Sequence, residues 1–374
     1  MTRVAAFVRG WFAEPPATFE LRQPGARWGT PRPREARHPL RVAEVIRETD
    51  STRTFVLEAP GGGAPPFSYR AGQHLTLLVD LNGTTQRRCY SFSTSPQVAG
   101  RPAITVKRTA NGVVSNYLHD RVRIGDTLLA LEPTGDFALD TDPGAHRHRV
   151  LVAGGIGITP LVSIAEAVLH GEPTSRISLF YGNRHEGEIA FRQRLAMLEE
   201  GFPSRFRVCH ALDRAPADWR GLRGPLDGQR LLQALAGERA DRYFVCGPEP
   251  MMQSVCAALE SAGVPRAHIR TERFAYAAAD ATRIPAHDAE IHFARSGRRV
   301  KARAGQTILQ AGLEAGIDLP HSCTMGGCGA CKLRRLGGRV IMNEPNCLSE
   351  DERDSGHLLA CCAFADTDVV IEGH

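Results

Sequence analysis

The stretch His321-Ser322-Cys323-Thr324-Met325-Gly326-Gly327-Cys328-Gly329-Ala330-Cys331 holds three cysteines in the pattern C-x4-C-x2-C, and Cys361 follows after a long gap. This is the plant-type spacing for a [2Fe–2S] cluster. Four thiolates are needed because each ferric ion takes four sulfurs and the two bridging sulfides supply only half of them. The intervening glycines let the loop fold over a cluster and direct backbone N–H groups at its sulfurs. The stretch therefore predicts a centre that moves single electrons.

The identity of the fourth ligand is open on spacing alone. Cys361 and Cys362 are adjacent, and Cys347 is a further candidate with a shorter gap. A zinc site would usually bring a second C-x2-C pair, and a disulfide framework would need a short secreted chain. The remaining cysteines are expected to be packed thiols: Cys89, Cys209, Cys246 and Cys256.

Composition limits the functions that the chain can have. At 374 residues the chain is too long for one core, so two or three domains are expected. No apolar run is long enough to span a bilayer, and cysteines placed for metal fit a reducing cytosol, so we expect a cytoplasmic protein without a transmembrane anchor.

Eight arginines against three glutamates in residues 1–41 account for the whole formal charge of +5. The remainder is balanced, which argues against nucleic acid as a partner.

Residues 1–40 are a Pro/Arg-rich N-terminal extension that we expect to lack regular structure for the most part. Val4, Phe7, Val8 and Trp11 have helical spacing and predict one short amphipathic helix. We favour an arm packed on its own protein. The alternative is an arm that docks on a membrane surface or an acidic partner.

Residues 41–142 predict an antiparallel β-barrel or sandwich. Short apolar–polar alternations are separated by turn residues: 41–46, 54–57, 74–79 and 103–107. A single helix is predicted over 115–120.

Residues 143–275 predict a doubly wound parallel sheet of the α/β class. Residues 149–153 form a continuous apolar run, typical of a strand covered on both faces. Strands at 177–181, 206–210 and 242–246 then alternate with helices at 161–170, 189–200, 231–235 and 251–262, which is the βαβ pattern. The alanine-rich residues 276–286 are expected to be a linker. Residues 287–374 form a third, α+β module with a hairpin at 289–302, a helix at 308–316 and the cysteine loop.

Two motifs in the first module suit a flavin. In Arg88-Cys89-Tyr90-Ser91, the guanidinium can hold a pyrophosphate, the Tyr ring can stack on the flavin, and the Ser hydroxyl can reach the N5 edge. Gly112-Val113-Val114-Ser115 opens the helix, and a helix N-terminus with a small N-cap is an anion site. Val106 and Lys107, at the end of the 103–107 strand, are expected to line the same site.

Two loops in the second module suit a nicotinamide dinucleotide. Each follows a strand and precedes a helix, so both lie at the carboxyl edge of the sheet and frame one crevice. The first is not a G-x-G-x-x-G fingerprint, but its glycines let the backbone approach phosphates. The candidate residues are Gly154, Gly155, Gly157, Thr159, Pro160, Cys246, Gly247, Pro248 and Met251.

Arg184 and Arg192 can pair with a 2′-phosphate, and no acidic residue closes the 177–181 strand to hold a free 2′-hydroxyl. NADPH is therefore favoured over NADH. In Thr271-Glu272-Arg273-Phe274, the aromatic ring can cover the flavin until nicotinamide displaces it, and the carboxylate can polarise the approach.

Together these motifs resemble the ferredoxin–NADP reductase superfamily, over about residues 41–372. More narrowly, they resemble oxygenase reductases with a C-terminal ferredoxin domain, such as the reductase subunit of phenylacetyl-CoA epoxidase. The matching residues include Tyr181-Gly182-Asn183-Arg184, Glu272-Arg273-Phe274 and the four cysteines. The extension departs from that pattern and is similar to that of desaturase-partner reductases.

The resemblance implies FAD, a nicotinamide donor, one [2Fe–2S] cluster in a β-grasp ferredoxin domain, and catalytic roles for Ser91, Glu272 and Phe274. It implies that Leu359-Ala360-Cys361 marks the fourth ligand, so the cluster ligands are Cys323, Cys328, Cys331 and Cys361. Electrons are expected to pass from NAD(P)H to FAD, to the cluster, and to a separate oxygenase, hydroxylase or desaturase. The alternatives are a reductase for a cytochrome P450 or a free ferredoxin, and a non-enzymatic redox sensor.

Overall fold

A computed structural model describes residues 36–81, 83–98, 100–274, 283–324, 326–344, 346–348 and 350–372. Residues 37–374 form one compact unit. Most of the predicted extension, with its amphipathic helix, and most of the predicted linker lie outside the described residues. Within the described part of the chain, no helix is long and apolar enough to cross a membrane.

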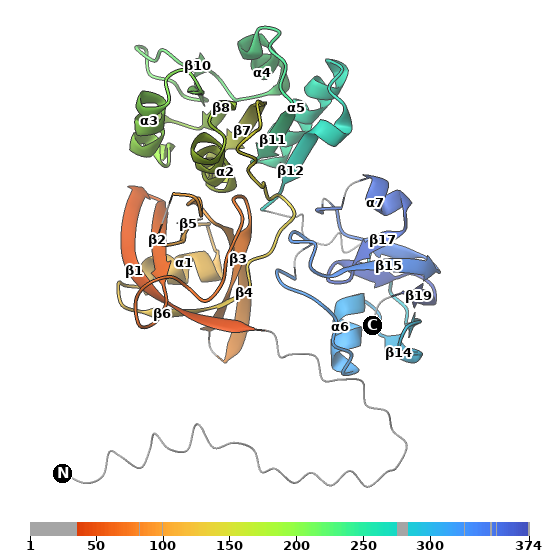
Figure 1. Cartoon of the computed structure of the whole chain (residues 1–374). Helices are drawn as coiled ribbons and strands as arrows, with labels where there is room; N and C mark the ends of the chain where they lie inside the picture. Colours follow the sequence, from red (N-terminus) through yellow and green to blue (C-terminus); the bar gives the residue numbers. More distant parts are fainter. Residues whose placement is uncertain are drawn as a thin grey trace, which may run out of the picture. The chain divides into compact units, whose positions relative to one another are not determined.

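The first module is a six-stranded antiparallel sheet in the order β4-β3-β6-β1-β2-β5 (Figure 1). An isolated bridge joins Phe92, which follows β4, to Ile104 of β5. These are the two edge strands, so the sheet nearly closes into a barrel. Leucine, valine and phenylalanine side chains fill its interior. The elements are β1 (Arg37–Thr49), β2 (Thr52–Glu58), β3 (His74–Leu81), β4 (Thr84–Ser91), β5 (Ala103–Lys107), α1 (Val113–Asp120) and β6 (Thr127–Leu131).

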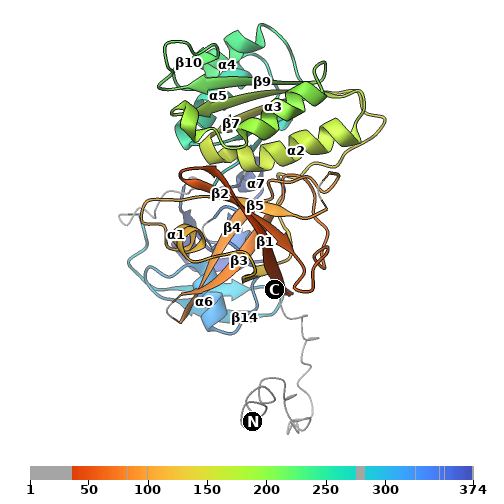
Figure 2. The same ribbon diagram turned by 90° about the vertical axis from the view of Figure 1, so that its left-hand side faces the viewer.

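The second module is a parallel sheet in the order β10-β9-β8-β7-β11-β12. Alternate residues of β7 pack into two separate cores, because helices α2 and α3 cover one face and α4 and α5 the other (Figure 2). The strand order reverses at β7, which places the switch point between β7 and β11. The strands are β7 (His148–Gly154), β8 (Arg176–Asn183), β9 (Phe206–Leu212), β10 (Leu222–Arg223), β11 (Arg242–Cys246) and β12 (Ile269–Glu272). The helices are α2 (Ile158–Gly171), α3 (Arg192–Gly201), α4 (Gly228–Leu235) and α5 (Glu249–Ser261), with short 3-10 turns at Gly155–Gly157, Glu186–Glu188 and Arg266–His268.

The third module has a mixed five-stranded sheet in the order β14-β13-β19-β15-β17 and a two-stranded sheet of β16 and β18. Helix α6 begins at a capping box in which Thr307 and Gln310 each satisfy the other's backbone N–H. The elements are β13 (Ala289–Phe293), β14 (Arg298–Ala302), α6 (Ile308–Glu314), β15 (Lys332–Gly337), β16 (Val340–Met342), α7 (Glu350–Asp354), β17 (His357–Leu359), β18 (Ala363–Ala365) and β19 (Val369–Ile371). The predicted three-part fold is confirmed.

Several element ends differ from the predicted ones. Strand β1 begins at Arg37, inside the segment expected to be an extension, because residues 37–41 pair with β6. Helix α4 begins earlier than expected, at Gly228, since the Asp227 side chain accepts a hydrogen bond from the Arg230 backbone and caps it. Helix α3 begins later, at Arg192, because Phe191 takes a left-handed conformation with φ of 59° and is buried in the core.

Candidate active site

A cavity of about 1060 Å³ brings most of the predicted flavin residues together. Its walls come from all three modules. The barrel contributes Arg88, Tyr90, Ser91, Lys107, Gly112, Val114 and Ser115; the parallel sheet contributes Ile156, Thr159 and Arg184; Phe274 follows β12; and the third module contributes Thr324, Asn343, Cys361 and Cys362. The volume is that of a site for a large organic ligand.

Arg88 supplies a positive charge to this cavity. It lies on β4 opposite Leu77 of β3, and its Nη1 donates a 2.7 Å hydrogen bond to the carbonyl of Arg87. Among the described residues no carboxylate forms an ion pair with Arg88. The guanidinium is therefore available for an anionic group. Tyr90, two residues further on, is largely buried, and burial raises the pKa of its phenol.

The start of helix α1 presents backbone N–H groups to the same cavity. Gly112 is the N-cap and makes no side-chain capping bond. A Cβ atom at Gly112 would lie 2.5 Å from the Ser115 hydroxyl oxygen, so glycine leaves room for this hydroxyl. Ser115 accepts a 3.2 Å hydrogen bond from the Thr109 backbone. The uncapped N–H groups at a helix start can bind an anion.

Lys107 and Arg184 meet at one carboxylate. Lys107 Nζ lies 3.2 Å from Glu188 Oε2, and Arg184 Nε donates to the same oxygen at 3.0 Å. Burial alone would raise the pKa of Glu188, but the two cations lower it below its usual value. Val106, by contrast, is buried in the barrel core and does not line the cavity; its backbone carbonyl accepts a hydrogen bond from His119 Nε2 at 2.9 Å.

The two glycine-rich loops of the second module pack against each other. A Cβ atom at Gly154 would lie 2.5 Å from Pro248 Cδ and 2.8 Å from Met251 Sδ, and one at Gly157 would collide with the Cys246 carbonyl. Of these glycines, Gly155 alone faces open space, with φ of 52°. We expected the glycines to let phosphates approach. At Gly154, Gly157 and Gly247 the structure shows a further reason for glycine, which is close contact between the loops, and the approach of phosphates stays a prediction.

Arg192 and Arg184 line different cavities. Arg192 lines a separate cavity of about 540 Å³ with Glu186, His210, Trp219 and Arg220, and its Nη2 lies 2.5 Å from Glu186 Oε1. Sequence reasoning grouped the two arginines and missed the other four residues. His210 Nδ1 has no hydrogen-bond partner in the described part of the chain.

Ser91 and Glu272 meet between the barrel and the parallel sheet. Ser91 Oγ donates to Glu272 Oε2 at 3.4 Å, and His74 Nδ1 lies 4.0 Å from Glu272 Oε1. Burial raises the pKa of Glu272 to about 8 and lowers the pKa of His74 to about 4. Both groups are therefore neutral near pH 6, and their contact is not an ion pair there. Phe274 is 38% exposed and borders the large cavity.

The cysteine loop directs backbone donors at sulfur atoms. Gly327 N–H lies 3.3 Å from Cys323 Sγ, Cys323 N–H lies 3.4 Å from Cys328 Sγ, and Gly326 N–H lies 3.1 Å from Cys361 Sγ. Gly326 and Gly329 have φ of 79° and 71°, in the left-handed region that glycine adopts freely.

The four predicted cysteines form two contacting pairs. A hydrogen bond with Cys323, in which the Cys328 thiol donates, raises the pKa of Cys328 to about 11, and contact with Cys361 raises the pKa of Cys331. Two pairs suit two iron ions that each take two thiolates, so the donor set fits a [2Fe–2S] cluster. Cys362 is also buried beside the loop, and a Cβ atom at Gly326 would lie 3.0 Å from its sulfur.

Family models match three parts of the chain. Residues 39–139 match an oxidoreductase FAD-binding domain, residues 151–257 an oxidoreductase NAD-binding domain, and residues 291–366 a 2Fe-2S iron–sulfur cluster binding domain. The fold and these matches define an oxidoreductase that uses a flavin and an iron–sulfur centre.

Relatives of known function narrow the class. The chain is 33% identical to one subunit of the 1,2-phenylacetyl-CoA epoxidase of Escherichia coli, over 90% of this chain and 97% of that protein. It is 34% identical to the ferredoxin reductase component of 3-ketosteroid-9-alpha-monooxygenase of Rhodococcus rhodochrous, over 88% of this chain and 94% of that protein. The solved structure of phthalate dioxygenase reductase matches this chain with a TM-score of 0.62 and 26% sequence identity. The match covers 90% of this chain and 97% of that one. The chain belongs to this family of modular reductases and passes electrons from a pyridine nucleotide through FAD to a [2Fe–2S] centre.

Proposed function

We propose that the chain is the reductase component of an oxygenase, hydroxylase or desaturase system and delivers single electrons to a separate terminal enzyme. One observation carries this proposal. A single cavity extends from Arg88 and Ser115 of the barrel to Cys361 of the third module, so a flavin held at one end lies beside a cluster ligand at the other. The relatives act in oxygenase systems, which supports this kind of acceptor.

The cavity residues divide into three proposed roles. Bound FAD supplies the conversion of a two-electron hydride into single electrons. Arg88 and the N–H groups at the start of α1 hold its pyrophosphate, and Tyr90 stacks on its ring system. Ser91 and Glu272 position the nicotinamide and the flavin edge, and Phe274 covers that edge until the nicotinamide enters. Cys323, Cys328, Cys331 and Cys361 hold the cluster.

For the nucleotide we propose NADPH. The cavity at the carboxyl end of β9 contains two guanidinium groups, Arg192 and Arg220, which can bind a 2′-phosphate. Glu186 already pairs with Arg192, so the phosphate has to displace this carboxylate. Arg192→Ala should lower kcat/KM for NADPH about tenfold or more and leave kcat/KM for NADH unchanged. Equal losses with both nucleotides would contradict this assignment.

A cytoplasmic location is part of the proposal. None of the ten cysteines forms a disulfide in the structure, as expected in a reducing compartment. The N-terminal arm is proposed to pack on its own protein, and a shortened chain that begins near residue 36 tests this proposal. Unchanged electron transfer with lost activity towards the terminal enzyme would instead assign the arm to partner docking.

The test of the acceptor is reconstitution. Purified reductase is mixed with a purified terminal oxygenase of the kind that its relatives serve, and product formation is compared with nucleotide consumption. Matched consumption and product formation support the proposal, whereas activity only with an added cytochrome P450 or ferredoxin overturns it. Cytochrome c and ferricyanide serve as controls. We expect Cys361→Ser to lose cytochrome c reduction, because single electrons are proposed to leave through the cluster, and to keep ferricyanide reduction by the flavin.

A further inference from the structure

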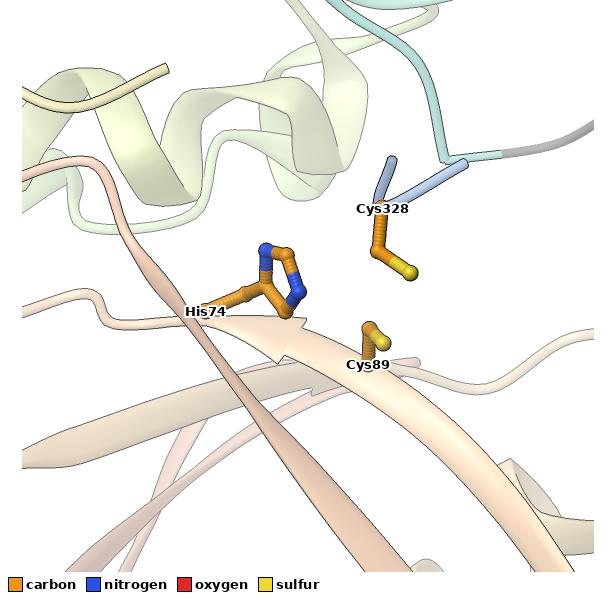
Figure 3. Close-up of side chains that lie close together, drawn as sticks. All are labelled: His74, Cys89 and Cys328. Atoms are coloured by element: carbon orange, nitrogen blue, oxygen red, sulfur yellow. The ribbon is translucent and has the colours of Figure 1, made fainter. Parts of the chain in front are cut away.

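Cys89 brings a thiol from the flavin-binding strand to the cysteine loop. It lies between Arg88 and Tyr90 on β4, and strand alternation turns its side chain away from theirs. Cys89 Sγ, Cys328 Sγ and a ring nitrogen of His74 all lie within 4.8 Å of one another (Figure 3). A small cavity of about 40 Å³ borders Cys89, Cys323 and Cys328. The thiol of a barrel residue thus lies within 4.8 Å of the sulfur of an expected cluster ligand, Cys328.

Polar contacts hold this thiol in place. Cys89 Sγ lies 3.1 Å from the hydroxyl of Thr76, its neighbour across β3, and 3.9 Å from the hydroxyl of Ser322. The Thr76 and Ser322 hydroxyls are 2.5 Å apart, and both residues are buried. Ser322 directly precedes Cys323, so these contacts tie the barrel to the start of the cysteine loop.

The ligand atoms of His74, Cys89 and Cys328 are close enough to bind one metal ion. We do not assign such a site, because Cys328 pairs with Cys323 in the set that fits the cluster. Cys89 is then a neighbour of a ligand and not a ligand. A thiol carries a weak S–H donor, and Cys328 Sγ is an acceptor within 4.8 Å of Cys89 Sγ.

We propose that the Cys89 thiol donates an S–H···S hydrogen bond to Cys328 and thereby raises the reduction potential of the cluster. Hydrogen bonds to cluster sulfurs stabilise the reduced form, which carries more negative charge. Cys89 is thus a positioning residue that makes electron acceptance from the neighbouring flavin more favourable. The inference rests on the proposed ligand role of Cys328.

The test uses full-length protein with its cofactors and four variants. Iron and sulfide content and the electron paramagnetic resonance signal of the reduced cluster report whether the cluster is present, and an equilibrium redox titration gives its midpoint potential. Cys89→Ala should retain the cluster at a more negative potential. Cys89→Ser keeps a donor and should return the potential towards the wild-type value. Cys256→Ala, on α5, is the matched control and should change nothing.

A wild-type potential in Cys89→Ala would overturn the proposal. Loss of the cluster from that variant would also overturn it, because Cys89 would then be needed for cluster retention. The fourth variant, Cys328→Ser, tests the ligand set separately. If that variant keeps a normal cluster, the ligand assignment in the proposed function fails, whatever the potential of Cys89→Ala.

Discussion

Ser91 donates a 3.4 Å hydrogen bond to Glu272, and this contact joins strand β4 of the barrel to strand β12 of the parallel sheet. The two residues belong to different sheets, so the contact depends on the packing of one module against the other. The Glu272 side chain is only 12% exposed, and burial raises its pKa to about 8, although the Ser91 hydrogen bond by itself would lower it.

We expect this carboxyl group to give flavin reduction a dependence on pH. The folded pKa is raised above the ordinary value, so Glu272 is neutral below about pH 8 and ionised above it. A carboxylate there would stabilise the positive charge that develops on the nicotinamide as hydride leaves. The rate of flavin reduction should therefore rise through about pH 8, measured by stopped-flow absorbance with saturating NADPH.

Glu272→Gln should remove this rise, and Glu260→Gln, on the exposed face of α5, should keep it. An unchanged inflection in Glu272→Gln would assign the ionisation to another group. The same pKa shift has a stability consequence. The stabilising contribution of the neutral carboxyl group is complete below its ordinary pKa and is lost as pH rises through about 8.

Arg88→Ala should weaken FAD binding about 10- to 100-fold, because one charge-assisted hydrogen bond contributes about 1.5–3 kcal/mol. The measurement is the flavin-to-protein absorbance ratio after purification, followed by titration of the flavin-free protein with FAD. Arg121→Ala is the control, since Arg121 is exposed just after α1 and does not line the cavity. Full flavin content in Arg88→Ala would remove Arg88 from the pyrophosphate site.

The adjacent cysteines near the C-terminus allow a matched comparison. Cys361→Ser should lose most of the cluster, because the Cys361 sulfur contacts Cys331 and accepts the Gly326 N–H. Cys362→Ser should retain it. Iron content and visible absorbance check both variants, and the reverse result would make Cys362 the fourth ligand.

A buried ion pair supports the second module. Arg149 donates to Glu172 at 2.6 and 2.9 Å, and the two side chains are 2% and 0% exposed. Arg149→Met would leave the buried Glu172 carboxylate without its positively charged partner. The free energy of unfolding of this module should therefore fall by about 3–5 kcal/mol. Denaturant unfolding followed by Trp219 fluorescence measures the change. Arg176→Met removes an exposed arginine and should have an effect of about 1 kcal/mol or less. Equal effects would show that the buried pair makes no special contribution.

Much of the site could be predicted because its residues are close in sequence. The C-x4-C-x2-C spacing and Arg88-Cys89-Tyr90-Ser91 are local patterns with a direct chemical meaning, and the alternation of strands and helices indicated both large sheets. The strongest deviations depend on tertiary structure. Arg192 was grouped with Arg184, yet Arg192 lines a cavity with Trp219 and Arg220, and Arg184 lines a different one.

The contact of Cys89 with Cys328 could not be predicted for the same reason. The two cysteines are far apart in sequence, and no pattern around Cys89 distinguishes it from a packed thiol. The contact requires the barrel and the cysteine loop to be folded and packed together. A Cβ atom at Gly154 or Gly157 would collide with residues that end or follow β11. This is likewise apparent only when β7 and β11 are neighbours in the sheet.

The most direct test of the relay is an anaerobic titration of the purified protein with NADPH, and separately with NADH, followed by visible absorbance. We predict that the flavin and iron–sulfur bands both bleach within seconds, with NADPH the better donor. Flavin bleaching with an unchanged cluster would break the relay after FAD. An absence of bleaching with either nucleotide would contradict the reductase function and favour a redox sensor.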